Sequence, residues 1–303
     1  MKIMSEILIC IPTYNRNKSL IDCLKSIKKL KNNNLFKIKI LIVDNSITNN
    51  SYKTIKRFNR KLHFKIYQSH EKKRGIVFAR NKCLQIARKL KPNYIAFIDD
   101  DCKVDKNWLK NIYKLLNKVD ADVVTGPQLY EGKNKDNYMY LFEKKYKKNF
   151  LKVDWAASNN VFFKFDILKL EKNIKFDKNL NKFGMGEDQL FFSIINKIGY
   201  KIYWSKKVVV TEKLHPHRSN ISWIKERSKR LGILGHYLDI KMHGKIIGYF
   251  VNYIKSFYLF FFSMLIYINI FNVNRNLDFT NNLFRFYGKL IGPFKIKKIH
   301  FLK

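Results

Sequence analysis

The sequence has few acidic residues, few cysteines and little proline or glycine for its length. Only 23 Asp and Glu residues stand against 61 Lys and Arg residues in 303, so the formal net charge is +38. The four cysteines, Cys10, Cys23, Cys83 and Cys102, include no C-x-x-C pair. This spacing argues against a cysteine zinc site or a disulfide framework. We therefore expect free, buried thiols in a reducing compartment.

No apolar segment of signal-peptide length precedes the first expected strand, so we expect no signal peptide. The basic excess would suit an anionic partner such as nucleic acid, anionic lipid or an anionic substrate. The Lys and Arg residues are spread along the chain and form no single block, so the charge identifies no particular partner. The hydrophobic content of 46% is sufficient for a substantial core.

The first 127 residues alternate short apolar runs with amphipathic segments. This alternation predicts an α/β fold with a mostly parallel central sheet flanked by helices. Polar residues follow three of the strands, at Thr13, Asp44 and Asp99, and parallel strands would bring them to one edge of the sheet. The expected strands are 7–11, 37–43, 63–67, 94–98 and 122–125, and the expected helices are 20–30, 50–60, 76–90 and 108–119.

The second half changes character and ends in a hydrophobic helical extension. Residues 256–271 carry no charge over 16 residues, which is short of the roughly 18–20 that a spanning helix needs. Extending the segment back to Ile246 places Lys255 near its middle. We expect an interfacial helix or a re-entrant hairpin; a helix docked on the preceding α/β domain is the alternative. The other expected elements are helices at 138–147 and 187–198 and strands at 153–157, 161–165, 200–204 and 208–211.

Three consecutive carboxylates, Asp99, Asp100 and Asp101, follow the apolar run 94–98. Charged residues in this number cannot belong to a core, because buried charges need partners. Hard oxygen ligands suit Mg²⁺ or Mn²⁺, and magnesium sites combine carboxylates with substrate phosphates. The triplet therefore suggests a metal–diphosphate site; an acidic turn that caps the next helix is the alternative.

A second acidic pair, Glu187 and Asp188, follows the glycines Gly184 and Gly186 at the start of an expected helix. The positive end of the helix dipole favours ionised carboxylates, whereas burial and mutual repulsion raise their pKa values. A carboxylate balanced in this way is a candidate general base. A helix-stabilising role is the alternative for the pair by itself.

Five segments together resemble the family 2 glycosyltransferases of the GT-A fold, over about residues 5–235. Their order and spacing carry the resemblance more than any single segment does. The segments are Pro12-Thr13-Tyr14-Asn15-Arg16, Val43-Asp44-Asn45-Ser46, the run Gly75 to Asn81 ending Ala79-Arg80-Asn81, Asp99-Asp100-Asp101, and Gly186-Glu187-Asp188.

The resemblance implies a nucleotide-diphosphate sugar as donor, Mn²⁺ or Mg²⁺ as cofactor, and inversion at the anomeric carbon. Asp188 matches the catalytic base, with Glu187 beside it, and Asp101 matches the metal ligand. Asp99 would face the ribose and also belongs to the metal site. The other residues that the resemblance assigns to donor binding are Pro12, Thr13, Tyr14, Arg16, Asp44, Arg80 and Asp100, the last with no particular contact.

The sequence departs from the family pattern at two positions. Family members often carry a His after the last strand; here Glu212 stands at that position and His215 lies just beyond, so either residue would complete the metal site. Asn45 follows Asp44 where many members have a second Asp. Trp204 resembles an aromatic position near the acceptor, to which we also assign Gly186, with an ordinary core Trp as the alternative reading of Trp204.

The sequence as a whole predicts a glycosyltransferase that acts at the cytoplasmic face of the cell membrane. It would bind an anionic membrane surface and a lipid-linked or oligosaccharide acceptor, and no nucleic acid. A nucleotidyltransferase and a basic RNA-binding protein without activity are the alternatives. The expected divisions are a nucleotide-sugar-binding half at 1–127, an acceptor and catalytic-base half at 128–235, and a membrane-associating extension at 236–303.

Overall fold

The computed structural model describes residues 5–32, 34–59, 64–131, 148–213, 218, 220–267 and 273–298. The chain divides into two compact units, which we describe separately. The first comprises residues 1–131 and 144–213, and the second comprises 132–143 and 214–303. The predicted helix at 138–147 and the candidate ligand His215 lie outside the described residues.

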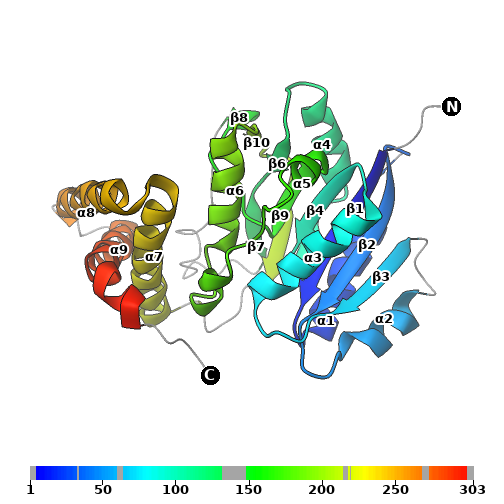
Figure 1. The fold of residues 1–303 in the computed structure, drawn as a ribbon, viewed down its shortest axis with the longest axis horizontal. Coiled ribbons are helices and arrows are strands. Elements are labelled where there is room, and N and C mark those ends of the chain that lie inside the picture. The colour runs from blue at the N-terminus through cyan, green and yellow to red at the C-terminus, as the bar shows by residue number, and fades with distance from the viewer. Residues whose placement is uncertain are drawn as a thin grey trace. The chain divides into compact units, whose positions relative to one another are not determined.

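A mixed sheet forms the centre of the first unit (Figure 1). Among the described residues its strand order is β3-β2-β1-β4-β9-β6-β10-β8. β9 runs antiparallel to both β4 and β6, and β8 is antiparallel to β10, whereas the other neighbouring pairs are parallel. The strands are β1 (Ser5–Thr13), β2 (Phe36–Asp44), β3 (Lys65–His70), β4 (Tyr94–Ile98), β6 (Val123–Thr125), β8 (Leu151–Lys152), β9 (Asn160–Lys164) and β10 (Ile202–Trp204).

Helices cover both faces of this sheet because its central strands are apolar on both sides. In β1, Ile7, Ile9 and Ile11 pack in one buried cluster, and Leu8 and Cys10 pack in another. This alternation follows from the two-residue period of a strand. The first cluster includes residues of α1 (Asn17–Lys28), α2 (Ser51–Asn59) and α4 (Trp108–Leu116); the second includes residues of α3 (Ile76–Leu90), α5 (Asp166–Leu170) and α6 (Glu187–Ile198).

A smaller sheet has the order β5-β11-β7. Its strands are β5 (Cys102–Val104), β7 (Gln128–Glu131) and β11 (Val210–Lys213). β11 is antiparallel to β5 and parallel to β7, and this register places Glu212 opposite Cys102. The sheet therefore brings the segment after the Asp triplet beside a residue more than a hundred positions later in the chain.

The predicted α/β class and the mostly parallel first half are confirmed. Register pairs Thr13 with Asp44, so these two strand ends do lie at the same edge. The predicted strand at 153–157 is wrong: the extended pairing there is the short β8, and residues 153–159 connect it to β9. The sequence signal failed because Val153 and Ala156 are buried without joining a ladder, so their apolar character reflects packing rather than strand pairing.

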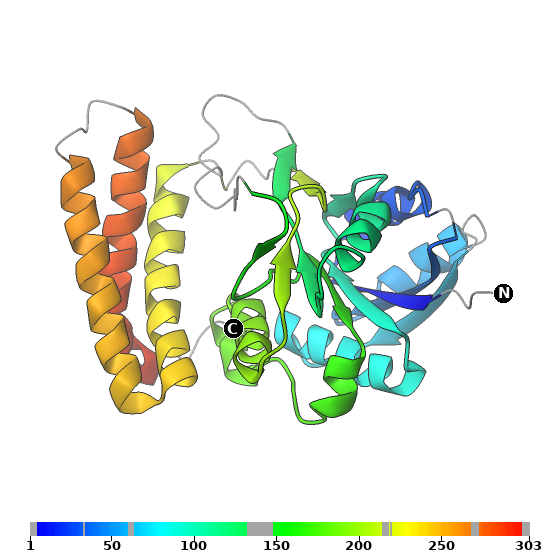
Figure 2. The same ribbon diagram turned by 90° about the horizontal axis from the view of Figure 1, so that it is seen from above.

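The described part of the second unit contains three helices, α7 (Ile221–His243), α8 (Lys245–Tyr267) and α9 (Val273–Lys298). Figure 2 shows them side by side in yellow, orange and red. α7 and α9 approach closely at Gly232 and Gly288, where an added Cβ on either residue would meet backbone of the opposite helix within 3 Å. The predicted boundary at 235/236 falls inside α7, which is continuous there.

Over residues 245–267, α8 is one uninterrupted helix, so a re-entrant hairpin within these residues is wrong. Lys255 lies within this helix, and its Nζ is 2.5 Å from Asp239 Oδ1 of α7. This ion pair gives the charge a partner within the bundle.

Candidate active site

The Asp triplet forms the tight connection between β4 and β5. The backbone N–H of Cys102 donates to the carbonyl oxygen of Asp99 (3.1 Å), which turns the chain directly after the buried strand. The three side chains consequently have different surroundings. Asp100 is buried, whereas the side chains of Asp99 and Asp101 are 32% and 12% exposed. Within the triplet, only these two retain surface for a ligand.

Asp100 joins the triplet to the loop after β1. Its carboxylate accepts a 2.6 Å hydrogen bond from Thr13 Oγ1 and a 3.2 Å bond from Arg16 Nη1. The same Arg16 nitrogen lies 2.6 Å from Asp101 Oδ2. Burial raises the pKa of the Asp100 carboxyl to about 6, against the opposing Thr13 hydrogen bond and the Arg16 charge. The sequence assigned Asp100 no contact; the structure shows that it holds two loops together.

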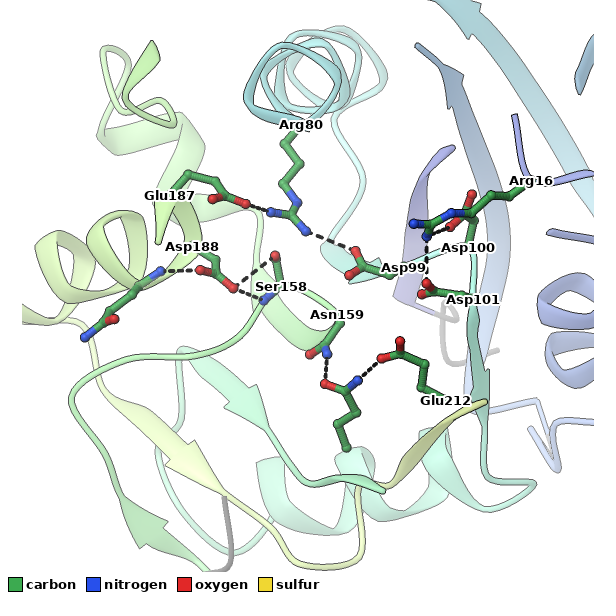
Figure 3. A network of polar contacts seen from close by, with 12 residues as sticks. Arg16, Arg80, Asp99, Asp100, Asp101, Ser158, Asn159, Glu187, Asp188 and Glu212 are labelled. Carbon is green, nitrogen blue, oxygen red and sulfur yellow. Dashed lines mark hydrogen bonds and ion pairs between the residues drawn. The ribbon is translucent and has the colours of Figure 1, made fainter. Parts of the chain in front are cut away.

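Arg80 of α3 bridges the two acidic clusters (Figure 3). Its Nη2 donates to Asp99 Oδ1 (3.0 Å), and its Nη1 donates to Glu187 Oε1 at the start of α6. Arg80 and Glu187 are both nearly fully buried. Burial by itself would lower the pKa of Arg80, but the carboxylates of Glu187 and Asp99 raise it, so the guanidinium stays charged.

Glu187 faces this guanidinium. Burial raises its pKa to about 7, although the positive charge of Arg80 opposes the shift. Glu187 Oε2 is buried and has no hydrogen-bond partner among the described residues. The contacts of Glu187 connect the start of α6 to the strand that carries the triplet, through Arg80.

Asp188 is held in a defined orientation at the first turn of α6. Its Oδ1 accepts the backbone N–H of Gln189 (2.7 Å), and its Oδ2 lies 3.2 Å from the backbone N and 3.4 Å from Oγ of Ser158. Gly186 precedes the helix with φ of 86°, in the left-handed region where residues with a Cβ are strained. The glycine therefore allows the sharp entry that places Asp188 at the helix start.

The turn Ser158-Asn159-Asn160 was not assigned a role from the sequence. It immediately precedes and begins β9, whose antiparallel direction brings it to the edge where the parallel strands end. Asn159 Nδ2 donates to Gln128 Oε1, and Gln128 Nε2 donates to Glu212 Oε2. Three successive polar residues between apolar segments were the available signal, but their partners lie on distant elements.

Asp101, Cys102 and Glu212 each offer one ligand atom, and these atoms lie within 4.8 Å of one another. The two carboxylates suit Mg²⁺ or Mn²⁺, which prefer oxygen ligands. Glu212 thus lies where a metal bound to Asp101 could reach it, which fits one of the two predicted options. Among the described residues, this is the one group of three or more His, Cys, Asp or Glu side chains that lie close enough together to share a metal ion.

The residues predicted to hold the base and ribose lie around the ends of β1 and β2. Asp44 is buried, with Oδ1 accepting from the Ser46 N–H (2.7 Å) and Oδ2 from the Ser51 N–H (2.8 Å) at the start of α2. Its contacts therefore stabilise a loop and a helix end. Tyr14, after Pro12 and Thr13, is partly exposed, and the Arg74 guanidinium lies 5.5 Å from its ring centroid.

The contacts of Asn45 account for the amide at this position, where many family members have a second Asp. Its Nδ2 donates to the carbonyl oxygens of Glu71 (2.8 Å) and Lys73 (2.7 Å), and its Oδ1 accepts from the Gly75 N–H (2.7 Å). An ionised Asp could not donate to the two carbonyls. Here the amide organises the loop that leads into α3.

Trp204, the candidate acceptor residue, ends β10 and is 3% exposed. It belongs to the cluster that contains Phe191 and Phe192 of α6. This burial agrees with the alternative reading of a core tryptophan.

The polar network of Figure 3 gathers most of the predicted site residues at one place. It joins Arg16, Arg80, the triplet, Glu187, Asp188 and Glu212 to their partners. These residues come from the loop after β1, from α3, from the β4–β5 turn, from the start of α6 and from β11. The two acidic clusters, almost ninety residues apart in the sequence, therefore belong to one site.

The fold around this site is the GT-A fold. A solved structure of the mannosyltransferase PcManGT from Pyrobaculum calidifontis, in complex with GDP-Man and Mn²⁺, superposes with a TM-score of 0.64 at 14% identity. The alignment covers 97% of this chain and 88% of that one.

Residues 8–174 match the glycosyl transferase family 2, and the chain belongs to that family. It is 31% identical over 140 residues to the glycosyltransferase GlyG of Streptococcus pneumoniae, covering 46% of this chain and 44% of GlyG. It is 26% identical over 196 residues to the poly(ribitol-phosphate) beta-N-acetylglucosaminyltransferase TarP of Staphylococcus aureus, covering 62% of this chain and 56% of TarP. The chain thus matches about half the length of these two relatives.

Proposed function

We propose that this chain is an inverting, metal-dependent glycosyltransferase that moves a sugar from a nucleotide-diphosphate sugar to an acceptor hydroxyl. The observation that carries the proposal is the closeness of the two groups. Ser158 contacts Asp188, the next residue Asn159 is joined through Gln128 to Glu212, and the carboxylates of Glu212 and Asp101 lie within 4.8 Å of each other. A displacement at a sugar carbon needs a base for the attacking hydroxyl and a cation beside the leaving diphosphate, and both would lie at one edge of the sheet. PcManGT, with GDP-Man and Mn²⁺ bound, supports this donor class and a divalent cation.

The residues would divide the reaction as follows. Asp101 and Glu212, with Asp99 nearby, would hold Mn²⁺ or Mg²⁺, which stabilises the negative charge of a departing diphosphate. Asp188 would accept the proton of the acceptor hydroxyl. At the same time the oxygen of that hydroxyl would form a bond to the anomeric carbon, and the bond from this carbon to the diphosphate would break. Attack from the face opposite the leaving group inverts the configuration.

Ser158 contributes to the orientation of the base. Its N–H and hydroxyl lie on one oxygen of Asp188, and the Gln189 N–H engages the other. Oδ2 thus accepts two hydrogen bonds, whereas Oδ1 accepts one and keeps a second lone-pair direction for the acceptor proton. Arg80 would hold Asp99 and Glu187 in place while leaving Asp188 to react.

The acceptor would be a lipid-linked or growing cell-surface polysaccharide. The name of TarP identifies poly(ribitol-phosphate) as the acceptor of that relative. The two alternatives that the sequence left open, nucleotidyl transfer and RNA binding without activity, find no support in the family that matches residues 8–174.

Asp101→Ala is expected to remove metal-stimulated turnover, because it deletes one of the two carboxylates that would hold the cation. The measurement is release of UDP or GDP from a panel of nucleotide sugars, with Mn²⁺ or with EDTA. The matched control is Asp22→Ala on α1, whose carboxylate pairs with Lys25 at the surface and should leave the rate unchanged. Equal Mn²⁺ stimulation in Asp101→Ala and wild type would contradict the assigned metal site.

The membrane part of the proposal rests on α8. Its outward residues include Phe250, Phe257 and Phe261, which are 66–71% exposed, whereas Asn252, Ser256 and Ser263 face inward and are buried. This is the reverse of a helix on the surface of a globular protein in water. Over Lys245–Leu265, α8 is long and apolar enough to cross a membrane, and 22% of an 18-residue apolar window within that stretch is buried.

The inward polar groups of α8 have partners in the bundle. Asn252 Oδ1 accepts from Lys289 Nζ of α9 (3.1 Å), and the hydroxyls of Ser256 and Ser263 donate to backbone carbonyls one turn earlier. At 100° per residue, the exposed apolar residues from Ile246 to Leu265 cover roughly 200° of the helix circumference. Contact with a single partner helix would cover only part of this apolar face, whereas lipid could cover all of it. We assign this helix to the cytoplasmic membrane surface.

Replacing Phe250, Phe257 and Phe261 together with Ser is expected to lower partitioning onto vesicles of phosphatidylglycerol and phosphatidylcholine at least tenfold. Each buried Phe contributes about 1.5–3 kcal/mol, and about 1.4 kcal/mol is tenfold. The matched control replaces the exposed apolar residues Ile47, Leu170 and Ile198 of the first unit with Ser. Unchanged vesicle binding in the α8 variant would overturn the lipid assignment, and a change only in sedimentation would indicate contact with a second copy.

A further inference from the structure

Two amides lie between the candidate metal carboxylate and the candidate base. Figure 3 shows Asn159 and Glu212 in this region of the site. Gln128 accepts from Asn159 and donates to Glu212. Asn159 follows Ser158, whose N–H and hydroxyl contact Asp188. We propose that Gln128 and Asn159 are positioning residues that hold Glu212 in its metal-binding orientation and fix it relative to Asp188. This inference rests on the proposed function.

The direction of the hydrogen bonds requires an amide at position 128. Gln128 donates from Nε2 to the carboxylate of Glu212 and accepts through Oε1 from Asn159. A carboxylate cannot donate, so Glu at position 128 would place an acceptor against Glu212 and add a like charge. A Leu of similar size could make neither bond. Gln thus supplies both a donor toward the metal side and an acceptor toward the base side.

We call the hydrogen bonds from Asn159 to Gln128 and from Gln128 to Glu212 the relay. The backbone at both ends of this relay is fixed. Gln128 begins β7, and the parallel register with β11 pairs it with Val210, two residues before Glu212. Side chains two residues apart on a strand share a face, so Gln128 and Glu212 are diagonal neighbours. The relay therefore starts from strand pairing in the smaller sheet and needs no flexible loop.

Asn160 fixes the other end. It is 1% exposed, and its Nδ2 donates to the carbonyl oxygens of Val208 (2.7 Å) and Pro127 (3.2 Å). Its Oδ1 accepts the indole N–H of Trp108 (2.9 Å). Pro127 directly precedes Gln128, so the turn that carries Asn159 is anchored beside the residue that Asn159 contacts. The geometry leaves little freedom for Glu212 to rotate away from Asp101.

The inference predicts weaker metal binding when the relay is broken. Partners of metal ligands typically change metal affinity 10- to 100-fold when they are replaced. We expect Gln128→Leu and Asn159→Leu each to raise the Mn²⁺ dissociation constant about tenfold or more, measured by electron paramagnetic resonance on the protein without donor. Gln128→Glu should weaken turnover through charge repulsion and wrong hydrogen-bond polarity. Melting temperatures should stay within a few degrees of wild type, and the exposed Gln85→Leu should match wild type in every measurement.

The outcomes separate this inference from the function on which it rests. If wild type binds Mn²⁺ and both Leu variants bind it equally well, the relay has no positioning role and the inference is overturned. If the variants lose metal affinity only in proportion to a large loss of melting temperature, Gln128 is structural and the inference is also overturned. A wild-type protein that binds no Mn²⁺ and turns over nucleotide sugar in EDTA overturns the metal assignment itself.

Discussion

Asp188→Asn is expected to lower the turnover number about 100- to 10,000-fold while leaving the affinity for the nucleotide sugar nearly unchanged. General-base catalysis contributes a factor of this size. Asn has the same shape as Asp and can still accept the Ser158 hydrogen bonds through its carbonyl oxygen, so the link to Ser158 should remain. Asn loses the hydrogen bond from the Gln189 N–H, because its NH₂ group cannot accept one, and it loses the ability to take a proton. The measurements are initial rates of sugar transfer and equilibrium binding of the donor.

Asp120→Asn is the matched control for this substitution. Asp120 precedes β6, at the end of that strand opposite to the candidate site, and its side chain is 70% exposed beside Lys164 and Lys201. The control should transfer sugar at the wild-type rate. An Asp188→Asn protein with normal turnover would remove Asp188 as the base and leave the inverting mechanism without a proton acceptor.

Arg80→Met is expected to lower the free energy of unfolding by about 3–5 kcal/mol, the usual cost of removing one partner of a buried ion pair. The substitution leaves Glu187 buried without its cation and Asp99 without its hydrogen bond. The measurement is urea denaturation at several pH values. Arg88→Met on the same helix is the comparison. Within the part of the chain that the structure describes, Arg88 donates to the Ile174 carbonyl alone, so its replacement should cost about 1 kcal/mol.

The loss in Arg80→Met should grow as the pH rises. Burial already raises the pKa of Glu187 to about 7 in the presence of Arg80, and removing the positive charge raises it further. A carboxyl with a raised pKa in the folded state favours folding below its unfolded pKa of about 4.3, and this contribution is lost as the pH rises through the folded value. We therefore expect a larger deficit at pH 8 than at pH 5.5.

The double variant Arg80→Met with Glu187→Gln tests the cause. The Gln removes the stranded charge, so most of the lost stability should return and its pH dependence should flatten. Burial also raises the pKa of Asp99, but its side chain is 32% exposed, so its share of the loss should be smaller. A double variant as unstable as Arg80→Met at every pH would show that packing of the Arg80 stem, and not the ion pair, determines the cost.

Much of the candidate site could be predicted from the sequence because its acidic residues directly follow strands or begin a helix. Asp99 to Asp101 end an apolar run, and Glu187-Asp188 follow two glycines, so local patterns were enough to find them. The roles inside the triplet were harder. Asp100 faces Thr13 because β1 and β4 are adjacent, and adjacency of strands separated by more than eighty residues is not a local property.

Strand order also explains the residues that the sequence analysis missed. β9 is inserted antiparallel between β4 and β6, although it follows both in the chain. This insertion brings Ser158 to Asp188 and Asn159 to Gln128. Nothing near residue 158 indicates which distant side chains it meets, since hydrogen-bond partners of this kind depend on the order of strands in the sheet.

By itself the sequence determined the α/β class, the edge of the sheet where the chemistry lies, and the two acidic clusters, because each is encoded by the period and ending of a single strand or helix. Only the tertiary structure decided how the three carboxylates of Asp99 to Asp101 divide their contacts, because Thr13, Arg16 and Arg80 reach them from other elements. The tertiary structure also decided which apolar residues of α8 are exposed and which polar residues are buried. Burial is a property of packed neighbours, and these neighbours are the helices α7 and α9.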